Sequence, residues 1–175
     1  TDLCTGAFGA VRCRSGSHPH LGDHRAGDPR YGMGSQRTCY PGEQLLWDQG
    51  HHHVAGVDEV GRGCFAGPVV TAAVILAKNF SARGEVNDSK LLSAKKRKIL
   101  SEIIKKEAIA FSIAEISVAI INEVGIGKAT QKAFRHAIKT LSIQPHFILI
   151  DAFYIENLTR KNQKPIVHGD GKSIS

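Results

Sequence analysis

The spacing of apolar residues changes several times along the chain, and each spacing predicts an element. Two β-branched, apolar runs predict strands over residues 54–60 and 67–77, and the glycine-rich turn between them predicts that these strands pair antiparallel. A partial alternation of apolar and polar residues predicts a third strand over residues 108–118. A continuous apolar run over residues 146–150 indicates a buried parallel strand that ends at Asp151.

Two segments carry apolar residues at helical spacing. Ser93 is suited to cap the first helix, whose apolar positions are Ile99, Leu100, Ile103 and Ile104. The second helix has an apolar face made of Ala129, Ala133, Phe134, Ala137, Ile138 and Leu141, and Pro145 stops it. Residues 164–168 resemble one more short strand. This order of strands and helices predicts an α/β fold with a mixed sheet flanked by helices.

The first 42 residues differ in composition from the rest of the chain. They contain no Ile and no Lys and are rich in Gly and Arg, so we expect residues 1–42 to be a disordered or loosely packed leader. The chain has 175 residues and 42% hydrophobic content, which suits one domain with a proper core. Neither a membrane span nor a signal peptide is predicted, so we expect a soluble protein of the cytoplasm.

The cysteine usage fits the same compartment. Three of the four cysteines lie in the leader and the fourth borders the candidate site, so we expect free thiols rather than two disulfides. These residues are Cys4, Cys13, Cys39 and Cys64.

The net charge of +7 belongs to the part of the chain that is predicted to fold. From Val54 onward there are 18 Lys and Arg against 11 Asp and Glu, a difference of +7, whereas the first 53 residues hold five of each. Such a basic domain fits a phosphate polymer as its partner. A basic protein with scattered lysines would have the same charge, so charge alone does not decide between these interpretations.

Two adjacent carboxylates end the first predicted strand. Asp58 and Glu59 are neighbours, so on an extended strand their side chains point to opposite faces. A carboxylate between Val57 and Val60 on a buried strand is costly unless it binds a cation. We therefore favour a metal site over an exposed acidic turn.

A glycine–arginine–glycine turn follows these acids at once. Gly61 and Gly63 leave backbone amides accessible, and Arg62 adds a planar cation that suits phosphate, which together predict a phosphate cradle beside the metal site. Asp151 ends the buried strand. From the residues alone, a metal ligand and a helix or turn cap are equally good interpretations of Asp151.

Four blocks of sequence resemble one family. GVDEVGRG at residues 56–63, followed by AGPVV at 66–70, resembles the opening signature of ribonuclease HII, the bacterial nuclease that cuts RNA joined to or paired with DNA. NDSK at 87–90, LID at 149–151 and HGDGKS at 168–173 resemble its later blocks, in the same order. The resemblance covers residues 43–175, which we therefore expect to form a ribonuclease H-like catalytic domain.

The resemblance implies a fold, a reaction and a set of site residues. It implies the ribonuclease H fold, with Asp58 and Asp151 on neighbouring central strands. It implies an endonuclease that hydrolyses the RNA strand of RNA–DNA hybrids and cuts 5′ of ribonucleotides embedded in duplex DNA, by catalysis with two Mg²⁺ or Mn²⁺ ions. Asp58, Glu59 and Asp151 would be the catalytic metal ligands, and we expect the protein to act as a monomer.

The same resemblance assigns residues that bind nucleic acid. Gly61, Arg62 and Gly63 would sense the ribose 2′-hydroxyl, the group that distinguishes RNA from DNA. The segment Asp88, Ser89 and Lys90 would bind the nucleic-acid backbone, and Lys172 and Ser173 match the active-site lysine and serine of the family. The alternative is a non-catalytic basic module that binds hybrid or duplex nucleic acid through its lysine-rich helices.

The chain departs from the family pattern at its end. Ribonuclease HII sequences continue past the fourth block with an alanine-rich helix, a final aspartate and a C-terminal region, whereas this sequence stops at Ser175. We therefore expect a C-terminally truncated fragment that binds metal weakly and cleaves poorly or not at all. We also expect the apolar side of the sheet behind Val57, Ile148 and Ile150 to be uncovered.

Overall fold

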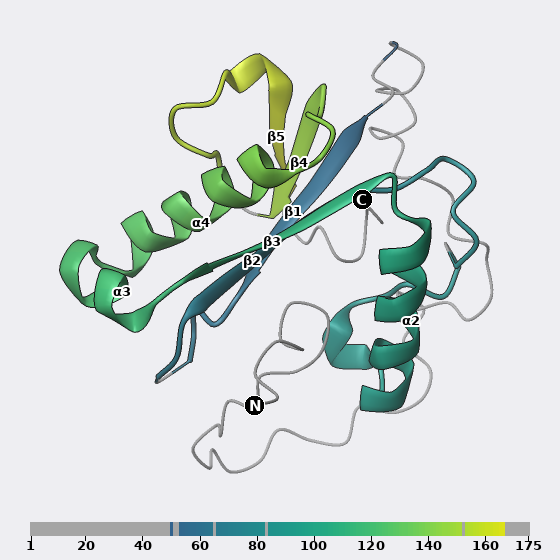
Figure 1. The fold of residues 1–175 in the computed structure, drawn as a ribbon, viewed down its shortest axis with the longest axis horizontal. Coiled ribbons are helices and arrows are strands. Elements are labelled where there is room, and N and C mark those ends of the chain that lie inside the picture. The colour runs from purple at the N-terminus through teal and green to yellow at the C-terminus, as the bar shows by residue number, and fades with distance from the viewer. Residues whose placement is uncertain (1–49, 51–52, 65, 83, 152, 167–175) are drawn as a thin grey trace.

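The chain folds around one five-stranded sheet. The structure is a computed structural model, and it describes residues 50, 53–64, 66–82, 84–151 and 153–166. The strands, in their order across the sheet, are β3 (Ala110–Ile116), β2 (Val69–Ile75), β1 (Val54–Val60), β4 (Phe147–Asp151) and β5 (Gln163–Ile166). Figure 1 shows these strands running side by side, with helices on either side of the sheet.

The sheet is mixed, as the sequence predicts. β1 pairs antiparallel with β2, β2 pairs antiparallel with β3, and β1 and β4 pair parallel, as do β4 and β5. The first two strands can pair through the short glycine-rich connection after β1, whereas a parallel strand needs a long crossover. That crossover leaves β3 and returns as β4, and it carries two helices, α3 (Val118–Val124) and α4 (Ile126–Thr140).

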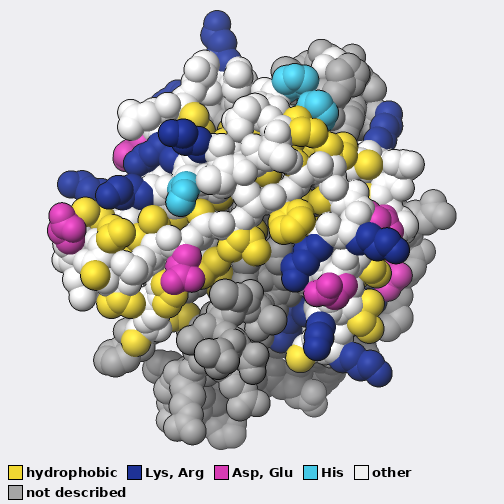
Figure 2. Space-filling view, in the orientation of Figure 1, with side chains coloured by type: hydrophobic (Ala, Val, Ile, Leu, Met, Phe, Trp, Pro, Cys, Tyr) yellow, Lys and Arg dark blue, Asp and Glu magenta, His cyan; other side chains and the backbone are white. Residues whose placement is uncertain are grey.

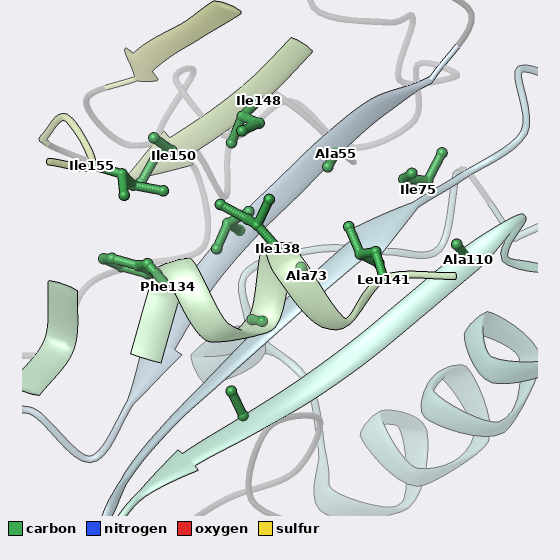
Figure 3. Packing of buried hydrophobic residues seen from close by; sticks show 13 residues of the cluster. Ala55, Ala73, Ile75, Ala110, Phe134, Ile138, Leu141, Ile148, Ile150 and Ile155 are labelled. Carbon is green, nitrogen blue, oxygen red and sulfur yellow. The ribbon is translucent and has the colours of Figure 1, made fainter. Parts of the chain in front are cut away.

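Helix α4 covers one face of the sheet and forms the main core with it. Its buried residues include Phe134, which is fully buried and packs among strand residues such as Val57, Ile148 and Ile150. Figure 3 shows Phe134, Ile148 and Ile150 between α4 and the strands. Our expectation that Val57, Ile148 and Ile150 are uncovered is therefore wrong, because they belong to the face on which α4 packs.

Helix α2 (Ala94–Glu107) lies against the opposite face. Ser93 caps it by accepting a hydrogen bond from the backbone N–H of Lys96 at 3.3 Å, as predicted. Its residue Leu100 packs with Val74 of β2 and with Phe80. The exposed apolar side chains Phe111 and Ile113 of the edge strand β3 are on this second face, and Figure 2 shows an apolar band along this strand.

The observed bounds of the strands are close to those that the sequence predicts. β1 has the bounds that the sequence predicts, whereas β2 and β3 are each shorter than expected by about two residues at both ends. Helix α3 is not predicted by the sequence pattern; it has seven residues and is separated from α4 by Gly125 with φ +82°. Within the described residues, no helix is long and apolar enough to cross a membrane. The predicted leader, residues 1–42, lies outside the described residues.

Candidate active site

The predicted catalytic acids lie near the carboxyl ends of two adjacent parallel strands. β1 and β4 are in register from Val54 opposite Phe147 to Val57 opposite Ile150. Asp58 and Asp151 are the next residue on each strand, so both carboxylates leave the sheet at the same end. The side chains of a strand alternate between its faces, which puts Asp58 and Asp151 on the face of α2 and Glu59 on the face of α4.

Glu59 is the most buried of the three acids. Its side chain is 12% exposed, and its carboxylate Oε1 lies 3.5 Å from Nη1 of Arg62, three residues further along the chain. Burial raises the pKa of the Glu59 carboxyl above its ordinary value of 4.5, Arg62 acts in the opposite direction, and the negative charge of Asp151 raises this pKa further. Glu59 and Asp151 are thus close enough to repel each other.

Asp58 is exposed, and its side chain is hydrogen-bonded to the backbone of the next residue. Its Oδ1 accepts a hydrogen bond from the backbone N–H of Glu59 at 2.8 Å. Across the described part of the chain, no group of three or more Asp, Glu, His or Cys side chains is gathered so that it could hold a metal ion. The three acids therefore share one end of the sheet without forming a completed metal site, and their role as ligands stays a prediction.

The turn after β1 depends on a glycine at its first position. Gly61 has φ +99°, and a Cβ atom added there would lie within 3.0 Å of the carbonyl oxygen of Pro68. Such a position excludes other residues, because it combines a left-handed backbone with a close approach to a second segment. Around Gly63, by contrast, an added Cβ would meet nothing within 4 Å, so this glycine is open to another molecule.

Arg62, between these glycines, has an aromatic neighbour that the sequence analysis missed. Its Cζ atom lies 4.9 Å from the centroid of the Phe153 ring. The signal available in the sequence was the position of Phe153, two residues after Asp151.

Cys64, at the end of the turn, is disulfide-bonded, so the expectation of free thiols is wrong for this residue.

The other predicted nucleic-acid residues lie on a separate segment. Ser89 and Lys90 begin a short 3₁₀ helix (Ser89–Leu91) that leads to α2, and Asp88 caps it by accepting from the backbone N–H of Lys90 at 2.9 Å. Arg97 of α2 fixes this loop, because its Nη1 donates to the carbonyl oxygens of Ser89 and Leu92 at 3.0 and 2.6 Å.

Lys90 is exposed, and its segment packs on the sheet face from which Asp58 projects. Lys172 and Ser173 lie outside the described residues.

Comparison with known sequences identifies one family. The model of the family described as ribonuclease HII matches residues 55–174. Ribonuclease HII of Ligilactobacillus salivarius is 49% identical over 133 residues, which are 76% of this chain and 51% of that protein. Ribonuclease HII of Koribacter versatilis is 47% identical over the same shares. The chain thus spans about half the length of these relatives.

Comparison with solved structures agrees with the fold. The crystal structure of ribonuclease H2 from Pyrococcus horikoshii matches with a TM-score of 0.58 and 24% identity, over 69% of this chain and 64% of that one. The ribonuclease HII of Archaeoglobus fulgidus, solved as a complex with PCNA, matches with a TM-score of 0.56 and 25% identity, over 69% and 65%. The likeness to the first shows a ribonuclease H-like fold. Together with the match over residues 55–174, these relatives establish that the chain belongs to the ribonuclease HII family.

Proposed function

We propose that this chain is part of a metal-dependent endonuclease that hydrolyses the RNA strand of RNA–DNA hybrids and cuts 5′ of ribonucleotides embedded in duplex DNA. The observation that carries the proposal is the position of Asp58 and Asp151 near the carboxyl ends of two adjacent parallel strands. Ligand sites of open α/β sheets lie beyond the carboxyl ends of the strands. The glycine–arginine–glycine turn follows β1 at the same end, which supports a site for a phosphate polymer there.

The acids suit Mg²⁺ or Mn²⁺ as cofactor. Asp58, Glu59 and Asp151 offer carboxylate oxygens, the ligands that hard divalent cations prefer. The charge of Asp151 opposes ionisation of Glu59, so a cation shared by both would relieve an existing repulsion. Two bound ions would activate water and stabilise the leaving oxygen. For these acids to bind the ions together, the Glu59 carboxylate would have to leave Arg62 and contact a cation. Asp58 would have to give up its hydrogen bond from the backbone N–H of Glu59.

The turn residues would recognise the ribonucleotide. Gly63 leaves space for a close approach of the sugar, and Gly61 sets the shape of the turn through its contact with the Pro68 segment. The side chain of Arg62 is 48% exposed, so its guanidinium keeps donors for a phosphate or for the 2′-hydroxyl. Lys90, with Asp88 and Ser89, would contact the backbone at a distance from the cut, and we assign Lys172 and Ser173 to the active site by the same motif match.

The rival function is a basic module that binds hybrid or duplex nucleic acid without cutting it. The basic side chains favour it as much as they favour an enzyme, since Figure 2 shows Lys and Arg on both flanks of the visible face. The two functions differ on a duplex with one embedded ribonucleotide. For the enzyme, the expected result is cleavage 5′ of that ribonucleotide with Mn²⁺, and none with a chelator, once the chain is extended by a family-like C-terminal segment, because the chain alone is expected to cleave poorly or not at all. Binding that never gives a metal-dependent product would favour the rival.

The recognition role of Arg62 has its own test. Arg62→Ala should reduce discrimination between a ribonucleotide and a deoxyribonucleotide more than it reduces total binding, because phosphate contacts elsewhere supply most of the affinity. Lys105→Ala, on the outer surface of α2, is a control that removes one charge from a different element. Equal losses on RNA-containing and all-DNA duplexes for Arg62→Ala would contradict the role.

A further inference from the structure

Arg62 is held between a carboxylate and an aromatic ring. Its Nη1 lies 3.5 Å from Oε1 of Glu59, and its Cζ lies 4.9 Å from the centroid of the Phe153 ring. These two partners belong to different segments, because Glu59 is in β1 and Phe153 follows the end of β4. Arg62 therefore connects the two strand ends that carry the candidate catalytic acids.

Phe153 is itself fixed on two sides. Its backbone N–H donates to the carbonyl oxygen of Asp151 at 2.9 Å, which ties the residue to the end of β4. Its ring lies 5.7 Å from the ring of Phe134, with 56° between the ring planes, and Phe134 is fully buried in the core beneath α4. The Phe153 ring is thus packed against the main hydrophobic core.

The two contacts of Arg62 differ in how they would respond to a cation. The ion pair with Glu59 competes with any metal ion that Glu59 binds, so metal binding would weaken or break it. The contact with the Phe153 ring needs no carboxylate, so it would persist when Glu59 binds a cation, and the N–H donors released from Glu59 could then contact a ribonucleotide. An arginine without such a support has many rotamers, and ordering them on binding costs affinity.

We propose that Phe153 is a positioning residue, whose ring holds the guanidinium of Arg62 beside the strand ends so that Arg62 is ready to contact a ribonucleotide. This inference rests on the proposed function of Arg62. Phe153 itself acts through Arg62. It would limit the positions of the guanidinium once the Glu59 carboxylate binds a cation instead of Arg62.

The test is a double-mutant cycle on binding. The full chain and its variants Phe153→Leu, Arg62→Ala and Arg62→Ala/Phe153→Leu are titrated, in Ca²⁺ to prevent cleavage, with a fluorescent duplex that has one ribonucleotide and with the all-DNA duplex. Phe153→Leu should reduce the preference for the ribonucleotide about two- to fivefold, the range of a partly exposed cation–π contact. In the Arg62→Ala background the same change should have no further effect.

Two further variants separate positioning from stability. Phe153→Tyr keeps the ring and should keep the preference. Tyr154→Leu removes the next ring along the chain, which stacks 5.0 Å from Cζ of Arg160, and should leave the preference unchanged. Additive effects of Phe153→Leu and Arg62→Ala would overturn the inference, and so would an equal loss of preference in Tyr154→Leu.

A measurement without nucleic acid tests whether Phe153 orders Arg62 even if the chain does not bind ribonucleotides. The side-chain Nε–H signal of Arg62 in a ¹⁵N NMR spectrum should show an ordered guanidinium shifted by the ring current of Phe153. Phe153→Leu should move this signal to the position of a mobile arginine, whereas Tyr154→Leu should not. If Arg62 is equally mobile in the wild type and in Phe153→Leu, Phe153 does not position it, whatever the chain binds.

Discussion

Gly61 should be the most sensitive position of the turn after β1, and Gly63 one of the least sensitive. The change Gly61→Ala adds one carbon atom at a residue whose φ is +99°. The added Cβ would lie within 3.0 Å of the carbonyl oxygen of Pro68 and 3.5 Å from Cα of Val69. The oxygen is a backbone atom and cannot rotate away, so the two segments have to separate.

The magnitude has two parts. A non-glycine residue held in a sparsely populated left-handed conformation costs about 1–3 kcal/mol. Separation of the segments adds to this cost, because Val60 and Val70 pair immediately beside the contact and their ladder would be strained. We expect Gly61→Ala to lower the free energy of unfolding by roughly 3 kcal/mol in total, near the upper end of common single substitutions. Gly63→Ala should change it by less than about 0.5 kcal/mol.

The assay is urea unfolding of both variants and the wild type, monitored by circular dichroism at 222 nm. A lower midpoint with an unchanged slope for Gly61→Ala would show that the native state has lost stability. The Gly63→Ala variant is the matched control, since it makes the same chemical change two residues away in open space. If the two variants unfold within about 0.5 kcal/mol of each other, the close approach of Gly61 to Pro68 does not constrain this turn.

Three further substitutions test the interior and the site. Glu59→Gln should raise the free energy of unfolding more at pH 7.5 than at pH 4. The pKa of the Glu59 carboxyl is raised in the folded chain, so the wild type loses stability as the pH rises and Glu59 ionises, whereas glutamine stays neutral. An equal effect at both pH values in urea unfolding would contradict this. Thr71→Val should raise the free energy of unfolding by about 1 kcal/mol, because the buried Thr71 hydroxyl has no hydrogen-bond partner among the described residues, and a loss would show that it has one. Gln163→Ala should cost about 3 kcal/mol, since the buried Gln163 side chain makes three hydrogen bonds of 2.8–3.0 Å to backbone groups of Ile155 and Leu158. Gln144→Ala, whose bonds are 3.3–3.5 Å long, is the control and should cost less than about 0.5 kcal/mol in the same thermal or urea melts.

Most of the fold could be predicted from local patterns. The alternation over residues 110–116 appears in the structure as alternate burial along β3, and the apolar face of the second predicted helix is the buried face of α4. Helix α3 could not be found in this way, since its seven residues are too few to show a period and its cap residue Ser117 makes no side-chain capping bond.

The packing of the helices on the sheet was not predictable from these patterns. Val57 and Val54 are both buried, on opposite faces of β1, so hydrophobicity does not indicate which face each helix covers. Our expectation of an uncovered surface behind Val57 failed for this reason. The exposed apolar residues of β3, Phe111 and Ile113, are on the other face, and the buried residues with which they alternate point toward α4.

The sequence predicts which residues belong to the site, and this assignment stays a prediction, whereas it does not predict their contacts. The adjacency of Asp58 and Asp151 came from the family resemblance, since no local pattern relates residues so far apart. The contact of Arg62 with Phe153 depends on Phe134, which α4 supplies from within the core. Such contacts between distant segments exist only once the crossover has placed β4 beside β1.

The pairing of the strands explains why this end of the sheet suits a charged site. β1 and β4 pair with each other as far as Val57 and Ile150, whereas β1 stays paired with β2 through Val60 and β4 stays paired with β5 through Asp151. Each strand thus remains anchored on its outer side after the two have stopped pairing with each other. Asp58 and Asp151 are held at these positions by the strand pairing, and Asp58 is exposed, so the proposed cation could reach Asp58. The turn after β1 and the residue Phe153 after β4 then meet at Arg62, which brings a positive charge to the acids from the same two strands.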